Sequence, residues 1–177
     1  MKSLLLALTL LVTPGCGIFG GTTAFNLHGG LRDLDKNIDS VNEQQAYGGE
    51  VVLGVKDGWS LEGQYFFATE EKTSALGGQS KLESNEFALG LRHTFLRNLP
   101  VKLYLGGGAN FVDAKLTNPN IPEQTDDGLG FYIHGGVTFA ILMFNAGIDL
   151  RAISTDARLA DERLDYGQAT IFIGLTF

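Results

Sequence analysis

Two histidines, His28 and His134, are the side chains of this sequence best suited to chemistry in an enclosed site. An imidazole can act as a general base, as a partner to a nucleophile or as a metal ligand. His134 is followed by two glycines and has no serine two positions on, and nothing in the spacing brings Ser84 or Ser154 to a histidine. Two histidines without a third ligand motif are weak support for a metal site. The pattern therefore favours a hydrogen-bonding role for both histidines and predicts neither catalysis nor a cofactor.

Two acidic pairs, Asp126-Asp127 and Asp161-Glu162, are the other candidates for binding an ion. Neither pair has the alternating oxygen-ligand spacing of a dedicated calcium loop. We therefore interpret both as solvated loop tips. The glycines lie within apolar-polar alternating segments, where they relieve crowding in a small barrel, and form no phosphate-binding loop.

Alternation of apolar and polar residues with a period of two organises the rest of the chain and predicts strands with one apolar face. The last stretch, 166–177, is the clearest example and ends on the aromatic Phe177. An edge strand this apolar would aggregate unless it paired with another strand, which favours a closed barrel. Eight such segments are predicted, at 25–31, 47–55, 59–67, 87–95, 101–111, 131–139, 144–152 and 166–177.

The connections between these segments alternate in length, with long polar ones at 33–45, 70–83, 113–127 and 155–165 and short ones between them. In an antiparallel meander all long connections then lie at one end and all short ones at the other. This is the layout of an outer-membrane barrel. The sequence thus predicts an all-β fold, an eight-stranded antiparallel up-and-down transmembrane β-barrel, over residues 24–177.

Aromatic residues on the apolar face recur at a spacing of eight residues, as in Phe87 and Phe95. At about 3.3 Å per residue and a tilt of about 40°, this spacing is ~20 Å, close to the height of a bilayer's apolar band. Sorting by loop length places these aromatics at two levels, as expected for the two membrane interfaces. A soluble barrel with the aromatics in its core would show no such sorting. The predicted interface aromatics are Trp59, Phe67, Phe87, Phe95, Phe131, Phe139 and Phe177.

The opposite, polar face is expected to line the lumen, where acids and bases must neutralise each other. Eight strands leave an interior that side chains fill, so we expect no substrate-sized pore. The predicted lumen network contains the acids Glu50, Glu62, Glu86 and Asp149, the bases Arg32, Arg92, Lys102 and Arg151, and His134.

The first 15 residues have the pattern of a secretory signal peptide, with Lys2 followed by a short apolar core. Cys16, the only cysteine, looks like the acylation cysteine of a lipoprotein; the alternative is ordinary cleavage nearby. The formal net charge of −7 and the absence of a basic patch argue against nucleic acid as a partner.

The sequence resembles the small eight-stranded bacterial outer-membrane β-barrel family, which contains OmpX and the transmembrane domain of OmpA. The resemblance rests on the leader, the strand count, the loop alternation, the segment 101–109 (VKLYLGGGA) and the terminal Phe177. It implies location in the bacterial outer membrane, contact with outer-membrane lipids, and recognition of the C-terminal aromatic by the outer-membrane assembly machinery.

Three functional hypotheses follow from this pattern. The first is a non-enzymatic outer-membrane barrel with a filled lumen, which acts through its extracellular loops on a partner that the sequence does not name, or in envelope integrity. The second is a lipid-modifying enzyme of the same architecture, although His134 lacks the histidine–serine arrangement of lipid A deacylase barrels. The third is a soluble, lipocalin-like periplasmic barrel with an apolar ligand inside.

Overall fold

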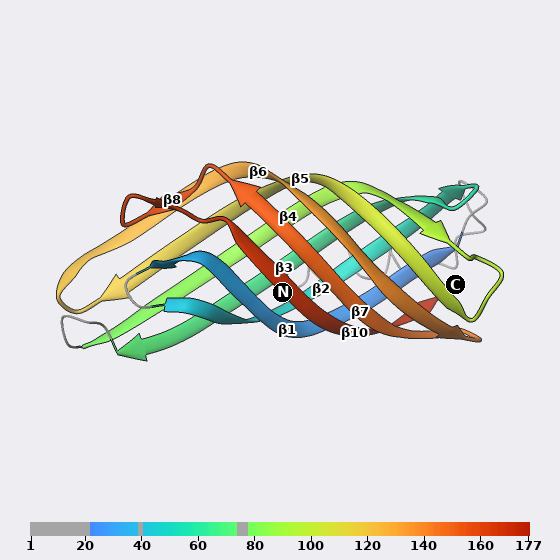
Figure 1. Cartoon of the computed structure of the whole chain (residues 1–177), viewed down its shortest axis with the longest axis horizontal. Helices are drawn as coiled ribbons and strands as arrows, with labels where there is room; N and C mark the ends of the chain where they lie inside the picture. Colours follow the sequence, from blue (N-terminus) through green and yellow to red (C-terminus); the bar gives the residue numbers. More distant parts are fainter. Residues whose placement is uncertain (1–21, 39–40, 74–77) are drawn as a thin grey trace, which may run out of the picture.

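The computed structural model describes residues 22–38, 41–73 and 78–177 and shows a closed antiparallel barrel. Its strand order is β1-β10-β7-β6-β5-β4-β3-β2, and β8 and β9 form a separate small hairpin (Figure 1). The strands are β1 Thr23–Ile38, β2 Val41–Lys56, β3 Trp59–Thr73, β4 Gln79–Phe95, β5 Val101–Asn118, β6 Ile121–Ile141, β7 Phe144–Thr155, β8 Arg158–Leu159, β9 Glu162–Arg163 and β10 Tyr166–Thr176. The predicted all-β, eight-stranded up-and-down barrel is confirmed.

The first and last strands close the barrel. β10 pairs with β1 from Ala24–Thr176 to Leu34–Tyr166 and with β7 on its other side. The strand that would otherwise expose an apolar edge therefore has a hydrogen-bonded neighbour on both sides.

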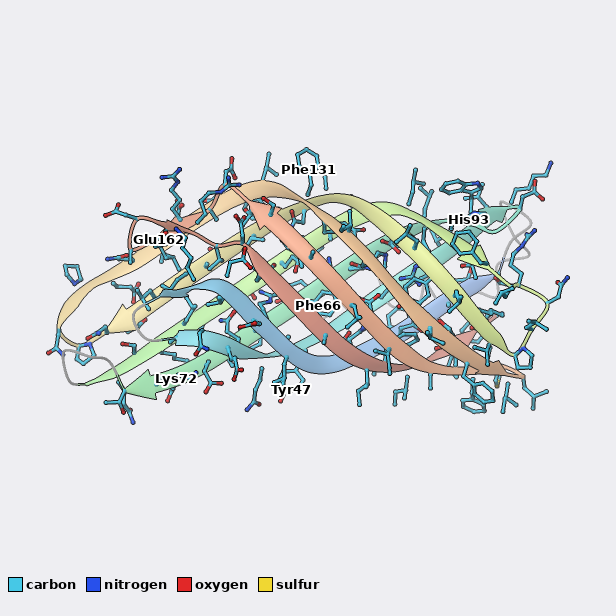
Figure 2. The ribbon with its side chains drawn as sticks, viewed as in Figure 1. Tyr47, Phe66, Lys72, His93, Phe131 and Glu162 are labelled. Atoms are coloured by element: carbon cyan, nitrogen blue, oxygen red, sulfur yellow. The ribbon has the colours of Figure 1, made fainter. Side chains whose placement is uncertain are left out.

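The outer face carries an apolar band. The aromatics predicted for the interfaces project outward, from the half-buried Phe67 to Phe131, which is 76% exposed. Figure 2 shows Tyr47 and Phe131 pointing away from opposite sides of the barrel, while Phe66 lies over its interior. This orientation excludes the inverted, lipocalin-like barrel, in which these rings would be inside.

The long polar connections are mostly strand and not loop, which corrects the sequence interpretation. β3 and β4 pair as far as Thr73–Gln79, and β5 and β6 pair to Asn118–Ile121. Asp126 and Asp127 accordingly lie within β6 and not at a loop tip. The barrel thus continues well beyond its apolar band, as the long hairpins at one end of Figure 1 show.

The polarity of both faces reverses in this extension. Along β4 the outward residues change from Phe87 to Asn85 and Glu83, while the inward residues change from Glu86 to Leu82. Inward and outward residues continue to alternate without a break along each strand. An interpretation that required the outward residues to be apolar therefore ended each strand too early. The inward residues form a buried apolar cluster: Leu34, Ile38, Val41, Leu82, Ala88, Val112, Ala114, Leu116, Tyr132, Ile153, Ala157, Leu159, Leu164 and Tyr166.

The short turns lie at the other end of the barrel. Between β2 and β3 the turn residues are Asp57 and Gly58, with φ of 53° and 88°. Positive φ at both positions is what a two-residue type I′ hairpin requires, and such a turn matches the twist of its strands. The predicted segments 47–55 and 59–67 leave a connection of three residues, 56–58. The structure shortens it to two, since Lys56 still pairs with Trp59.

The predicted signal peptide (1–15) and Cys16 lie outside the described residues. Within the described ranges, no helix is long and apolar enough to cross a membrane.

The extension should depend on its apolar interior as a soluble protein does. Leu116 is fully buried there, so Leu116→Ala should lower the free energy of unfolding by about 2–5 kcal/mol through lost burial and a cavity. The outward neighbour Thr117→Ala is the matched control and should change it by less than about 0.5 kcal/mol. Urea unfolding in detergent micelles and hydrogen exchange of the β5 and β6 amides measure the effect. Equal effects of both substitutions would contradict an apolar core in the extension.

Candidate functional site

The lumen of the membrane-facing part holds two connected clusters of buried charges. In the first, the His134 imidazole lies between two carboxylates: Nδ1 is 2.8 Å from Asp149 Oδ2, and Nε2 is 2.8 Å from Glu62 Oε1. Tyr104 and Tyr132 donate hydrogen bonds to Asp149 and Glu62, at 2.7 and 2.6 Å. Each carboxylate therefore has a ring nitrogen and a phenol as partners, as buried charges require.

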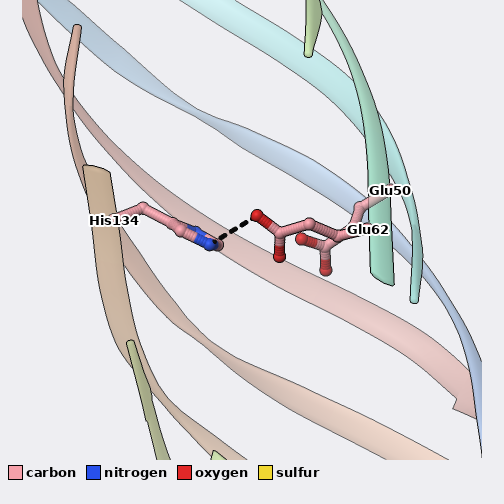
Figure 3. Close-up of side chains that lie close together, drawn as sticks. All are labelled: Glu50, Glu62 and His134. Atoms are coloured by element: carbon pink, nitrogen blue, oxygen red, sulfur yellow. Dashed lines mark ion pairs between the residues drawn. The ribbon is translucent and has the colours of Figure 1, made fainter. Parts of the chain in front are cut away.

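Arg92 joins this cluster to Glu50. Its Nε lies 2.9 Å from Glu62 Oε2, and its Nη2 donates a hydrogen bond to Glu50 Oε1. Gln64 and Asn26 also donate to Glu50. Figure 3 shows Glu50, Glu62 and His134 converging from β2, β3 and β6.

The second cluster is centred on Glu86, on the side of the extension. Arg151 donates to its Oε1 at 2.9 Å and Arg32 to its Oε2 at 3.1 Å. Tyr166 and Asn110 complete the set with hydrogen bonds of 2.8 and 3.3 Å. This single carboxylate therefore ties together strands β1, β4, β5, β7 and β10.

Aromatic rings cover the three buried arginines. Arg32 lies 3.9 Å above the ring of Tyr166, and Arg92 lies 4.1 Å above that of Tyr104. Such cation–π contacts are stronger when the cation is removed from water. Gly136 faces Tyr104, because an added Cβ there would be 2.4 Å from the phenol oxygen. The lumen thus alternates large rings with glycines and is filled by side chains.

The structure brings together most of the residues predicted for the lumen: Glu50, Glu62, Glu86, Arg92, Asp149, Arg151 and His134 are all buried, as is Arg32. Lys102 is different. It is half-buried near the short turns and forms no ion pair with any described residue. His134 instead lies between two of the acids, with a carboxylate at each ring nitrogen.

The sequence identified the charged residues but missed what joins them. Tyr104 and Tyr132 share the inward parity of the charged residues, but nothing in the sequence marks them as donors to Asp149 and Glu62. The sequence likewise gives no signal that Tyr166 binds Glu86. Tyr166 and Glu86 are 80 residues apart and meet only because the barrel closes.

The arrangement does not assemble a hydrolase triad. Ser84 accepts a hydrogen bond from Arg32 and donates to Gln44, while Ser154 lies on the exposed outer face and contacts Arg163. Neither serine contacts a histidine in the described part of the chain. Glu50, Glu62 and His134 could each offer an atom to one metal ion. However, Arg92 already lies against both glutamates, so this cluster has its cation in the protein itself.

The outside of the extension is strongly acidic. The described residues of the ranges 33–45, 69–85, 113–127 and 156–165 together carry 14 Asp or Glu and 6 Lys or Arg, a net charge of −8. We call the described residues of these ranges the acidic extension. Lys36–Glu162, Lys81–Glu83 and Lys115–Glu123 are ion pairs on its surface. With Arg163–Asp165 they engage four of its six cations, and acidic side chains remain in excess.

The model of a family described as the outer membrane protein beta-barrel domain matches residues 6–177. No curated protein sequence matches the chain significantly.

Solved structures of outer-membrane barrels are similar to this one. Ail of Yersinia pestis, in complex with the heparin analogue sucrose octasulfate, has a TM-score of 0.64 at 12% identity, covering 89% of this chain and 99% of Ail. The N-terminal barrel of Pseudomonas aeruginosa OprF has a TM-score of 0.62 at 15% identity, with 89% and 98% covered. P. aeruginosa OprG has a TM-score of 0.60 at 13% identity, covering 89% of this chain and 97% of OprG. At these identities the likeness shows the fold alone.

The Glu86 cluster should be the most sensitive point of the lumen. Glu86→Gln would leave Arg32 and Arg151 buried without their carboxylate, so the free energy of unfolding should fall by about 3–5 kcal/mol. Glu83→Gln, on the outer face of the same strand, breaks only a half-exposed pair with Lys81 and should have little effect. Reversible urea unfolding in micelles, followed by Trp59 fluorescence, measures both. A Glu86→Gln protein as stable as Glu83→Gln would show that the network contributes little.

Proposed function

Because the chain belongs to the outer membrane β-barrel protein family, and so to the bacterial outer membrane, we propose that it acts without catalysis, by presenting its acidic extension at the cell surface to a cationic partner. One observation supports this most directly. The strands continue past the lipid-facing band as a folded body with its own apolar interior, and the described residues of that body carry the net charge of −8. A rigid, paired surface of one sign favours partners of the opposite sign.

The lumen supports a structural role and not a transport role. Its carboxylates are each bound by arginine, histidine or tyrosine, and Arg32 and Glu86 are fully buried. Above them the apolar cluster fills the extension, and Leu159 and Leu164, around the β8–β9 hairpin, belong to this cluster. We propose that no substrate-sized path leads through the barrel.

The charge of the extension argues against the kind of ligand with which Ail was solved. Ail was solved with a heparin analogue, which is a polyanion. An extension with 14 acidic and 6 basic described side chains should repel a polyanion. We therefore propose a partner of the opposite kind, such as a basic protein segment, despite the shared fold.

The remaining partners are proposed from the family resemblance. Outer-membrane lipids should surround the apolar band. The assembly machinery should recognise the C-terminal strand, β10, together with Phe177, which projects outward.

A filled lumen predicts no steady conductance. The protein reconstituted in a planar bilayer should give no discrete current steps above those of protein-free bilayers, since ions would have to cross the Glu86 and His134 clusters. A general porin in the same bilayer is the positive control. Reproducible steps from the folded, heat-modifiable protein would contradict the filled lumen.

The acidic extension can be tested by neutralising exposed acids on four strands. The quadruple variant Glu43→Gln, Glu71→Gln, Asp113→Asn and Asp127→Asn changes residues that are all exposed. In nanodiscs of neutral lipid it should bind a polylysine surface about tenfold more weakly than the wild type at low salt, and neither protein should bind heparin.

A control variant replaces uncharged outward residues of the same hairpins, Gln45, Asn85, Thr117 and Thr125, by alanine and should bind polylysine as the wild type does. Wild-type protein that binds heparin in preference to polylysine, or equal binding by the two quadruple variants, would overturn the proposed partner chemistry.

A further inference from the structure

The lipid-facing wall has a groove near the short turns, at the opposite end from the acidic extension. The groove has a volume of about 400 Å³, within the range of about 300–1,000 Å³ that is usual for ligand pockets. Side chains of β3, β4 and β5 line it, together with backbone at two glycines: Trp59, Leu91, His93, Phe95, Leu105 and Gly106-Gly107.

A missing side chain creates the groove. Gly107 pairs with Leu91 on one side and with Ile133 on the other, so large outward residues flank it on both neighbouring strands. A Cβ at Gly107 would lie 2.8 Å from the Tyr132 carbonyl oxygen, so the position accommodates only glycine without a shift of the backbone. The gap in the apolar wall is therefore built into the sheet.

A polar ring lies at the edge of this apolar groove. His93 occupies an outward position, with its ring 4.8 Å from that of Trp59 and 4.7 Å from that of Phe95. Its Nδ1 atom is buried and has no hydrogen-bond partner among the described residues. The rest of the imidazole is only half-buried. A polar ring beside hydrocarbon is unfavourable unless it finds a partner, so a ligand with a hydrogen-bonding head beside its apolar part would suit this position. Figure 2 shows His93 at the end of the barrel away from Lys72 and Glu162.

Cationic side chains flank the same edge. A Cβ on Gly58 would be 3.2 Å from both Arg97 Cδ and His93 Cε1, so these two side chains converge on the β2–β3 turn. The backbone of Lys56 pairs with that of Trp59 across that turn. Asp57 is the one acid in the two turns 57–58 and 96–100. Long basic side chains at a membrane interface attract anionic headgroups.

We propose that this groove binds one acyl chain of an anionic phospholipid from the adjoining leaflet, with the headgroup phosphate held by Arg97 and Lys56 beside His93. Apolar wall, polar ring and cations follow one another toward the membrane surface, in the order in which a phospholipid presents its chain and its phosphate. Other outward glycines, such as Gly29, Gly49 and Gly63, also leave gaps in the band, whereas the gap at Gly107 lies beside Trp59 and His93, next to the turns that carry Lys56 and Arg97. The groove therefore adds lipid selectivity to a surface that is otherwise only apolar.

Trp59 makes the site directly observable, because it is the only tryptophan of the chain and lines the groove. The full protein is reconstituted in phosphatidylcholine vesicles that contain brominated phosphatidylglycerol or, separately, brominated phosphatidylcholine, and quenching of Trp59 is titrated. The relative association constant for the anionic lipid should be about fivefold higher, and Arg97→Gln should reduce the ratio toward one.

Two matched variants test the groove apart from the charge. Leu105→Phe narrows the groove and should reduce quenching by both lipids, whereas Leu89→Phe, equally lipid-facing but outside the lining, should not. Heat-dependent gel mobility verifies that each variant is folded. Equal quenching by the two lipids in the wild type, or a Leu105→Phe protein that behaves like Leu89→Phe, would overturn the site. Quenching that falls as the protein-to-lipid ratio rises would instead assign the groove to a second copy of the chain and equally overturn it.

Discussion

A closed barrel has one continuous inner surface, while its outer surface passes from hydrocarbon into water, and the rest of this structure depends on that constraint. Backbone hydrogen bonding fixes which residues point inward along each strand, so the polarity of the side chains must change where the surroundings change. Along β4 the change falls between Phe87 and Asn85 outside and between Glu86 and Leu82 inside. On β5, which pairs with β4, Phe111 is followed by Asp113 outside, and Asn110 is followed by Val112 inside. Neighbouring strands change at the same level because the register aligns Phe87 with Phe111.

The interior of the extension and that of the membrane-facing part are stabilised in different ways. Inside the extension, apolar side chains are removed from water and stabilise it as they would a soluble domain. Inside the membrane-facing part, the outer face already holds the apolar residues, so the inner one carries polar groups that must satisfy each other. Arginines stacked on tyrosines, with the same tyrosines hydrogen-bonded to the carboxylates, achieve this in a narrow space. Replacing such a network by apolar groups can be neutral for stability, whereas removing one partner is not, which explains why its members act as a unit.

The sequence predicts much of this fold because period-two alternation is a local signal. It located the eight membrane-facing segments and the parity of Glu50, Arg92 and His134. The sequence analysis ended the strands too early where the inward residues become apolar and the outward ones polar. Leu82 and Leu116 lie at inward positions, so they interrupt the pattern expected for a strand with an apolar outer face. Contacts across the closed barrel were also out of reach: the bond from Tyr166 to Glu86 depends on strand register summed around the barrel. Lys102 shared the parity of the lumen residues, but its distance from the acids is set by its level along the barrel axis, which alternation does not encode.

The inner and outer faces of the barrel differ in how many contacts hold their side chains, and this difference bears on function. The lumen side chains hold one another, and a change at one, such as Glu86, affects five strands. Outward residues of the extension make few contacts, so their charge can vary without loss of the fold. This is consistent with a barrel that has 12% identity to Ail and a TM-score of 0.64, and whose described extension carries a net charge of −8. At the other end Lys56 and Arg97 outnumber Asp57 in the turns beside the groove. The turns beside the groove and the extension therefore differ in the sign of their charge, and the buried lumen network ties together the strands that connect them.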